Sequence, residues 1–187
     1  MEPRNNDELI AQIDCGRPFK YLYFWGCEQE TKLPTKVCLS QWYKSPFRCG
    51  EKIFYTAEHY MMYRKALLFN DAKVASKILG NPKPGAAKAL GRQISGFDER
   101  IWFDKRYEIV VEGSYLKFTQ NTMLRSFLLN TKKRILVEAS PIDRIWGIGF
   151  SEDQVESADP NKWRGSNFLG YALMEARAQI QRESEKK

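Results

Sequence analysis

The sequence predicts an α+β fold, a single α-rich domain with a small β-sheet. Its 187 residues suit one domain, and a hydrophobic fraction of 43% with 13% aromatic residues is enough for a buried core. From Thr56 onward the apolar residues recur at helical spacing, whereas strand-like runs lie mostly before that residue. We expect a polar lead-in over residues 1–18, the domain over residues 19–181 and a charged tail over residues 182–187.

Strand-like segments make up the first part of the domain. Phe19–Trp25 is dense in aromatic residues and predicts a strand. Gly26–Lys36 is polar and rich in turn residues, which predicts a loop. Val37–Tyr43 and Glu51–Tyr55 are further strand candidates, and Lys44–Phe47 with its proline is expected to end the first of them.

Helices are expected over most of the remaining chain. Thr56 is a suitable N-cap for a helix on which Tyr60, Tyr63 and Leu67 share a face. Asp98 is a suitable N-cap for a second, long helix. The other expected elements are helices Asp71–Leu79, Pro84–Leu90, Met123–Leu129 and Asn167–Gln181, and the buried strand Ile135–Glu138.

Composition and simple motifs exclude several classes of protein. No apolar run reaches the ~18 residues of a membrane-spanning helix, and Met1–Glu8 lacks the apolar core of a signal peptide. We therefore expect a protein of the cytoplasm, or of the nucleus in a eukaryote, without membrane contact. Neither phosphate-binding glycine motif is present. His59 is the sole histidine and the four cysteines form no C-x-x-C pair, so we expect reduced thiols, no metal site and no cofactor.

The formal net charge of +7 is concentrated in two stretches. Tyr63–Gln93 has seven basic residues and one acid, and Tyr115–Ile135 has five basic residues and no acid. Solvated helix faces would explain both stretches. A positive field that attracts phosphate groups, on a small ligand or on nucleic acid, explains them equally well.

Three places combine an acid with aromatic residues. Glu58 falls in the first turn of the helix after Thr56, where its charge either stabilises the helix end or serves as a catalytic carboxylate. Lys65 lies two turns further along the same face of this helix. Trp102 is either a core residue or a platform for a base. Asp143 follows a strand and a proline, a position at which loops often carry function.

Arginines and glycines supply further candidate ligand contacts. The candidate phosphate ligands, for which surface ion pairs are the alternative, are Arg48, Arg92 and Arg106. Gly147 and Gly149 allow either close approach of the backbone to a ligand or a tight turn. Asn167 starts the last helix, where it contacts a ligand or only caps the helix.

Longer motifs run through nearly the whole chain, roughly from Lys20 to Arg177. They are Trp42-Tyr43-x-Ser45-Pro46-Phe47, Thr56–Met61, Lys65-Ala66, Leu90-Gly91-Arg92, Trp102 with Arg106, Lys117-Phe118-x-Gln120-Asn121, Leu136–Gly149 and Trp163–Gly170. In this order and at these spacings they resemble the NADAR family (NAD- and ADP-ribose-associated), which includes the YbiA-like N-glycosidases.

The resemblance implies hydrolysis of an N-glycosidic bond on a phosphorylated ribose. The family's catalytic residues fall on Glu58, Trp102 and Asp143. We expect Glu58 to face the anomeric carbon, Asp143 to polarise water or hold the ribose hydroxyls, and Trp102 to stack on the base or cover the sugar. Lys65 offers a second route, because an amine can capture an opened sugar as a Schiff base.

The remaining expected substrate contacts complete the predicted site. They are Phe24, Trp25, His59, Tyr60 and Trp146, together with the arginines, glycines and asparagine named above. Many family members have a Phe-Ser-Asn-Phe-like element where this chain has Leu22–Cys27, a departure that bears on substrate identity and not on the class of reaction.

Three functions follow from the resemblance. The first is removal of ADP-ribose from ADP-ribosylated guanine, in DNA, RNA or a nucleoside. The second is cleavage of phosphorylated ribosylamino-pyrimidine intermediates of riboflavin synthesis. The third is a non-catalytic module that binds ADP-ribose or nucleic acid. The expected partner is thus a substrate that contains ADP-ribose or a phosphoribosyl group, and the uneven basic charge favours nucleic acid.

Overall fold

A computed structural model describes residues 2–26 and 33–185 of the chain. Helices dominate, and the described strands pair into two small sheets. The helices are α1 (Asn6–Asp14), α2 (Ala57–Leu68), α3 (Ala72–Leu79), α4 (Pro84–Gly91), α5 (Glu99–Thr119), α6 (Thr122–Asn130) and α7 (Phe168–Glu185). The strands are β1 (Tyr21–Phe24), β2 (Phe47–Cys49), β3 (Lys52–Phe54) and β4 (Ile135–Glu138), and 3-10 turns cover Lys36–Leu39, Val155–Ala158 and Pro160–Lys162.

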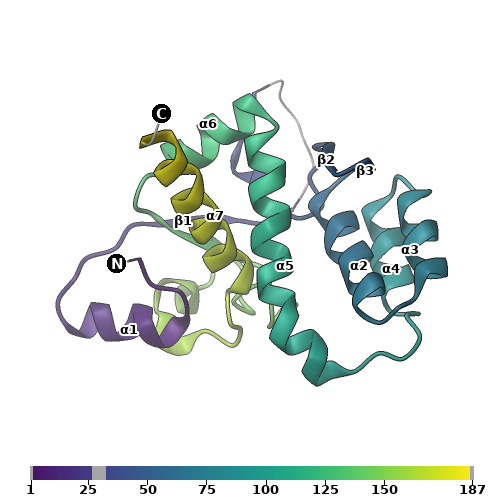
Figure 1. The fold of residues 1–187 in the computed structure, drawn as a ribbon. Coiled ribbons are helices and arrows are strands. Elements are labelled where there is room, and N and C mark those ends of the chain that lie inside the picture. The colour runs from purple at the N-terminus through teal and green to yellow at the C-terminus, as the bar shows by residue number, and fades with distance from the viewer. Residues whose placement is uncertain (1, 27–32, 186–187) are drawn as a thin grey trace.

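The long helix α5 runs through the middle of the molecule (Figure 1). Helix α7 packs on one side of it, and α2 with α3 and α4 lies on the other. Helices α2 and α5 approach closely where Gly113 faces Tyr60, because a Cβ at Gly113 would lie 2.7 Å from the Tyr60 ring. The core of the domain fills the space around α5 and is shared by both groups of helices.

Strands β1 and β4 form a parallel pair that α7 covers. Tyr21 pairs with Ile135 and Phe24 pairs with Glu138, so both strands end at the same edge. The N–H of Ala139 donates to the carbonyl of Phe24 and closes this edge. Ligands of parallel sheets bind beyond the carboxyl ends of the strands, which is where Glu138 and the loop after it lie.

Several helices begin at a residue whose side chain caps the helix. The side chains of Thr56, Asp71 and Asp98 each accept a hydrogen bond from a backbone N–H in the first turn of the helix that follows. Pro84 stands in the first turn of α4, where its missing N–H has no partner to lose. The expected strand Ile135–Glu138 is also confirmed, as β4.

The strand expected at Val37–Tyr43 is wrong. Lys36–Leu39 forms a 3-10 turn, and the ammonium group of Lys117 donates to the carbonyls of Cys38 and Ser40 at 2.7 and 2.8 Å. Those carbonyls are therefore satisfied by a side chain and not by a neighbouring strand. A strand that the sequence did not predict, β2, pairs with β3 across a turn in which Gly50 has a φ of 58°.

Both ends of the described chain are more regular than expected. Within the predicted lead-in, residues 6–14 form α1, with Asn5 as its N-cap and Leu9 fully buried. Helix α7 continues beyond Gln181 to Glu185, into the predicted tail. Most of the loop predicted at Gly26–Lys36 lies outside the described residues.

The described cysteines are free thiols, of which Cys38 is buried, Cys49 half-buried and Cys15 exposed. Cys27 lies outside the described residues. Among residues 2–26 and 33–185, no helix has the length and apolar character needed to cross a membrane.

Candidate active site

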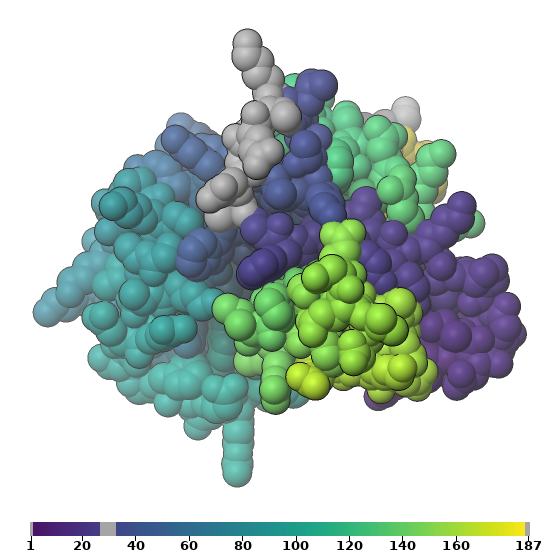
Figure 2. Space-filling view, turned by 180° about the vertical axis from the view of Figure 1, so that it is seen from behind, coloured from purple at the N-terminus to yellow at the C-terminus, as the bar shows by residue number. Residues whose placement is uncertain are grey.

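A cavity of about 210 Å³ lies where α2, α4 and α5 face the carboxyl end of β4. Figure 2 shows the face on which the green-to-lime surface of residues 140–165 lies beside the teal surface of residues 80–105. The charged residues that line the cavity are Glu58, Glu138, Asp143, Lys65, Lys88 and Arg92. Carboxylates and cations thus meet in one concave site, as expected of a site for a charged small molecule.

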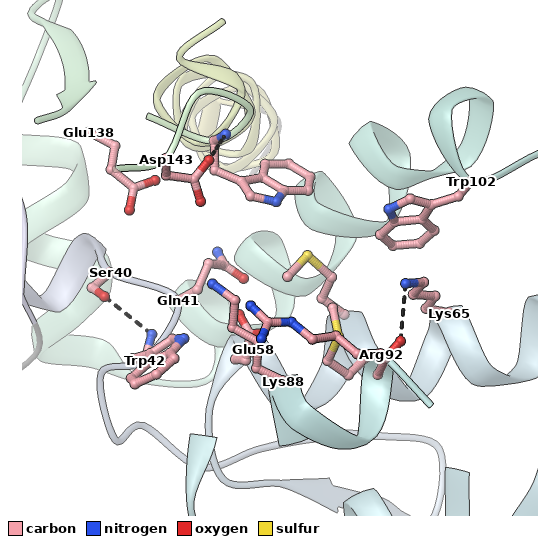
Figure 3. Close-up of a pocket in the computed structure, with 14 residues that line it drawn as sticks. Ser40, Gln41, Trp42, Glu58, Lys65, Lys88, Arg92, Trp102, Glu138 and Asp143 are labelled. Carbon is pink, nitrogen blue, oxygen red and sulfur yellow. Dashed lines mark hydrogen bonds between the residues drawn. The ribbon is translucent and has the colours of Figure 1, made fainter. Parts of the chain in front are cut away.

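The lining residues have a clear arrangement (Figure 3). The carboxylates of Glu138 and Asp143 lie on one wall and face Glu58 and Lys88 on the opposite wall. Trp102 lies at one end of the cavity beside Lys65, and Trp42 and Ser40 lie at the other end.

Glu58 is placed by the start of α2. Thr56 caps this helix, and the N–H of Glu58 donates to the carbonyl of Gln41 at 3.0 Å. Only 3% of Glu58 is exposed, and no described residue gives its Oε1 a hydrogen bond. Burial raises the pKa of Glu58 to about 7, and although Lys88 and Trp42 lower the pKa, they do not cancel the effect of burial. Such a carboxyl group is able both to accept and to release a proton near neutral pH.

Asp143 is held by a tight turn after β4. Its Oδ1 accepts hydrogen bonds from the N–H groups of Ile145 and Trp146 at 2.9 and 2.8 Å, and its own N–H donates to Ser140 Oγ. The turn therefore fixes one carboxylate oxygen and leaves the other available to the cavity that Asp143 lines.

Glu138 is the last residue of β4 and lines the same cavity. Burial, together with the charges of Asp143 and Glu58, raises its pKa to about 8, and the charge of Lys88 opposes this rise. Its Oε2 atom is buried, and no described residue gives it a hydrogen bond. The site therefore holds two buried carboxyl groups with raised pKa values, Glu58 and Glu138, close to the carboxylate of Asp143.

Lys65 lies in an aromatic niche of the cavity. Its ammonium group donates to the carbonyl of Gly91 at 3.1 Å and lies 4.0 Å from the ring centre of Phe97 and 5.3 Å from that of Trp102. Burial lowers the pKa of Lys65, an effect that the charges of Glu99 and Glu58 oppose. A lysine in this setting binds an anion when charged and is nucleophilic when neutral.

A second cavity of about 300 Å³ shares Lys65, Gly91, Arg92 and Trp102 with the first. It adds Arg106, which is 6% exposed and lies 3.7 Å from the Glu99 carboxylate. No described residue gives the Arg106 Nε a hydrogen bond. The two cavities are contiguous, so the site is an elongated cleft with carboxylates at one end, Arg106 toward the other and Arg92 between them.

The structure brings together seven of the predicted site residues. Glu58, Lys65, Arg92, Trp102, Asp143 and Trp146 line the first cavity, and Arg106 lines the contiguous second one together with Lys65, Arg92 and Trp102. All of these come from segments that are far apart in the sequence and that meet around α5.

The other predicted contacts lie outside both cavities. His59 is fully buried, with its ring nitrogens bonded to Thr56 Oγ1 and the carbonyl of Asn81. Tyr60 is fully buried and packs on Phe54. The structure therefore gives both aromatic side chains partners within the protein.

Three more of these contacts lie in or next to strands β1 and β2. Phe24 is a core residue with 1% exposure, and Trp25 is 53% exposed. Arg48 is exposed on the β2–β3 hairpin, where its backbone exchanges hydrogen bonds with the Gln120 side chain. None of the three lines either cavity of the described chain.

The glycines and Asn167 organise the backbone behind the site. A Cβ at Gly147 would lie 2.9 Å from the carbonyl oxygen of Glu138, and Gly149 has a φ of 74°. Asn167 is fully buried, donates to the carbonyl of Leu136 at 2.9 Å and accepts from the N–H of Glu138 at 3.0 Å. Gly147 and Asn167 thus pack against the end of β4, and Gly149 packs against Arg164 in the loop that follows.

Several cavity residues were not predicted. Gln41, Trp42, Lys88 and Glu138 line the first cavity. Trp42 and Glu138 stand in the motifs that carry the family resemblance, and Lys88 stands in the first basic stretch, but nothing local distinguishes them from structural residues. Among the described residues, no group of three or more His, Cys, Asp or Glu side chains is placed to hold a metal ion.

The sequence matches the NADAR domain over residues 23–181, most of the chain. The chain belongs to the NADAR family. The resemblance found in its motifs is thereby confirmed. Like those of its relatives that are named N-glycosidases, this NADAR protein is a hydrolase that acts on N-glycosyl bonds.

Individual relatives agree with this assignment. The chain is 40% identical to N-glycosidase R617 of Acanthamoeba polyphaga mimivirus over 167 residues, which cover 87% of this chain and 97% of that protein. It is 31% identical to N-glycosidase YbiA of Escherichia coli (strain K12) over 135 residues, which cover 72% of this chain and 76% of YbiA.

The NMR structure of E. coli YbiA superimposes with a TM-score of 0.72 at 27% identity and covers 90% of this chain and 89% of that chain. The predicted α+β fold of this NADAR protein, α-rich with a small β-component, is confirmed by that match.

Proposed function

We propose that this NADAR protein removes ADP-ribose from ADP-ribosylated guanine by cleaving the bond between ribose C1 and the guanine nitrogen. The observation that carries the proposal is the elongated cleft, with three carboxyl groups at one end, Arg106 toward the other and Arg92 between them. The two contiguous cavities together fall in the range of roughly 300–1,000 Å³ that is usual for small-molecule sites. ADP-ribose has its reacting sugar at one end and a diphosphate in the middle, which matches this distribution of charge.

Cleavage of the C1–N bond develops positive charge on the sugar. Glu58 is the proposed residue next to the anomeric carbon, where its carboxylate stabilises this charge and takes a proton from the attacking water. A pKa of about 7 suits that exchange at neutral pH. Asp143 orients the water or the ribose hydroxyls through its free oxygen, and Trp102 covers the sugar or stacks on the base.

Lys65 provides a distinct second route. Its depressed pKa and its place between Phe97 and Trp102 suit an amine that attacks an opened anomeric carbon. Borohydride treatment during turnover separates the routes. Direct attack by water leaves no protein–sugar adduct, whereas the lysine route gives an adduct that the Lys65→Ala variant cannot form.

The basic residues support a diphosphate and a nucleic-acid context. Of the five basic residues in Tyr115–Ile135, Lys117 is buried inside the protein. Lys132, Lys133 and Arg134 line an exposed groove with Lys20, at the amino ends of β1 and β4. This groove lies at the opposite end of the strands from the active-site cavity, so it supports an oligonucleotide substrate that is long enough to contact both.

Cleavage of a phosphorylated ribosylamino-pyrimidine is the second candidate function. The first cavity, at about 210 Å³ with Lys88 and Arg92 on its wall, suits a single phosphosugar without the second cavity. The names of N-glycosidase R617 and N-glycosidase YbiA state an activity that both candidates share and that argues against a module that only binds.

Parallel incubations decide between the two substrates. The protein is mixed with an ADP-ribosylated guanine nucleoside, with an oligonucleotide that contains this base, and with a ribosylamino-pyrimidine phosphate. We expect ADP-ribose to be released from the first two, with a lower KM for the oligonucleotide. Release of sugar phosphate from the pyrimidine substrate alone would overturn the proposed substrate and leave the N-glycosidase activity in place.

A further inference from the structure

Glu138 has no part in the mechanism described so far, yet it lies in the same cavity as the proposed catalytic groups. Its carboxyl group lies beside Asp143 on the wall that faces Glu58 (Figure 3). Its Oε2 atom is buried, and none of the described residues gives it a hydrogen bond. A buried carboxyl oxygen without a protein partner, aimed into a ligand cavity, is available to a group of the substrate.

The fold holds the Glu138 backbone on both sides. Its N–H donates to Asn167 Oδ1 at 3.0 Å, and its carbonyl accepts from the N–H of Ile148 at 3.0 Å. Asn167 adopts a φ of 50°, unusual for a residue other than glycine, and its fully buried amide also binds the carbonyl of Leu136. Gly147 leaves room at the Glu138 carbonyl that a Cβ would fill. These contacts fix the direction in which the Glu138 side chain leaves the strand.

We propose that Glu138 is the catalytic acid that gives a proton to the leaving nitrogen of the base. This inference rests on the proposed function. As the C1–N bond breaks, its electron pair goes to the nitrogen and the proton of Glu138 moves to that nitrogen. Water adds to C1, and its proton goes to Glu58. Transfer of that proton from Glu58 to Glu138, directly or through solvent, restores both groups for the next turnover.

The charges around Glu138 fit this division of roles. Asp143 and Glu58 face it and favour its neutral form, and Lys88 opposes them more weakly. Lys88 and Arg92 favour the ionised form of Glu58, whereas the charges of two neighbouring carboxylates favour the protonated form of Glu138. Of the other charged groups of the cavity, Lys65 lies at the far end beside Trp102, and Arg92 extends toward Glu58 and Lys88. Two carboxyl groups with separated pKa values are the usual basis of an acid and base pair.

The test is the pH profile of the Glu138→Gln variant on the N-glycoside that the wild type cleaves best. Glutamine keeps the shape and neutrality of a protonated glutamate and has no proton to transfer. We expect kcat to fall by about 10²–10⁴-fold with KM within a few-fold, and the alkaline limb of the kcat profile to disappear. Glu138→Asp should recover part of the rate together with that limb.

Two variants complete the design. Glu51→Gln, at an exposed hairpin turn, should match the wild type throughout, and Glu58→Gln should remove the acidic limb instead of the alkaline one. A Glu138→Gln variant that keeps both its alkaline limb and a rate within about threefold of wild type would overturn the role of Glu138. That result leaves the proposed function standing, because the wild-type reaction is measured on its own. If unfolding by urea shows that Glu138→Gln is unstable, the profile of Glu138→Asp decides: an unchanged alkaline limb at wild-type rate counts against the role.

Discussion

Replacement of Glu58 by glutamine is expected to stabilise the fold at alkaline pH while it slows turnover. The pKa of Glu58 rises from 4.5 to about 7 on folding because the carboxyl group is buried. Each unit corresponds to about 1.36 kcal/mol, so the ionised carboxylate costs the folded state about 3 kcal/mol. Since the folded-state pKa lies above the unfolded one, this stability is fully present below about pH 4.5 and is lost as the pH rises through about 7.

Glutamine stays neutral, so the variant does not lose that stability. We expect Glu58→Gln to exceed the wild type by up to about 3 kcal/mol in free energy of unfolding at pH 8, and by little at pH 5. Urea unfolding at both pH values measures the difference, with the exposed Glu51→Gln as control. Turnover should fall at least about 10²-fold, as for loss of a preorganised charge. A variant that is less stable than the wild type by the same amount at both pH values would refute the reasoning.

Three further substitutions separate packing from chemistry. Trp102 is 7% exposed and lines both cavities. Trp102→Phe should keep most of kcat. Trp102→Ala should lose activity, and its free energy of unfolding, measured by urea titration, should fall by about 3–5 kcal/mol. Arg106→Ala should raise the KM for an ADP-ribosylated substrate at least about tenfold, and leave the KM for a monophosphate unchanged, in steady-state assays. Lys117→Met leaves two buried carbonyls without their donor, so it should lower the unfolding free energy by roughly 1–3 kcal/mol for each carbonyl.

Elements with a local signal were predictable from the sequence. Thr56, Asp71 and Asp98 each cap a helix through a hydrogen bond that spans two or three residues, so the start of each helix is encoded where it occurs. The segment Val37–Tyr43 has strand-like composition, but its conformation depends on Lys117, about eighty residues further along the chain. The sequence of the segment alone therefore gives no indication of its contact with Lys117.

The candidate site divides in the same way. Glu58, Trp102 and Asp143 were predicted through motifs, and they line one cavity. In the sequence, Glu138 is simply the last residue of a predicted buried strand. Only the tertiary structure places its side chain at the carboxyl end of the parallel strand pair, beside Asp143. His59 is the reverse case. Its motif predicted a contact with a ligand, but both of its ring nitrogens form hydrogen bonds within the protein.

The most direct measurement is the rate at which the wild-type protein and Glu58→Gln release ADP-ribose from an oligonucleotide with one ADP-ribosylated guanine. Mass spectrometry follows both products over time. The proposed function predicts that the wild type yields intact ADP-ribose and the unmodified oligonucleotide, at least about a hundredfold faster than the variant. Two results would contradict the account: the wild type leaves ADP-ribose on the oligonucleotide, or both proteins release ADP-ribose at the same rate.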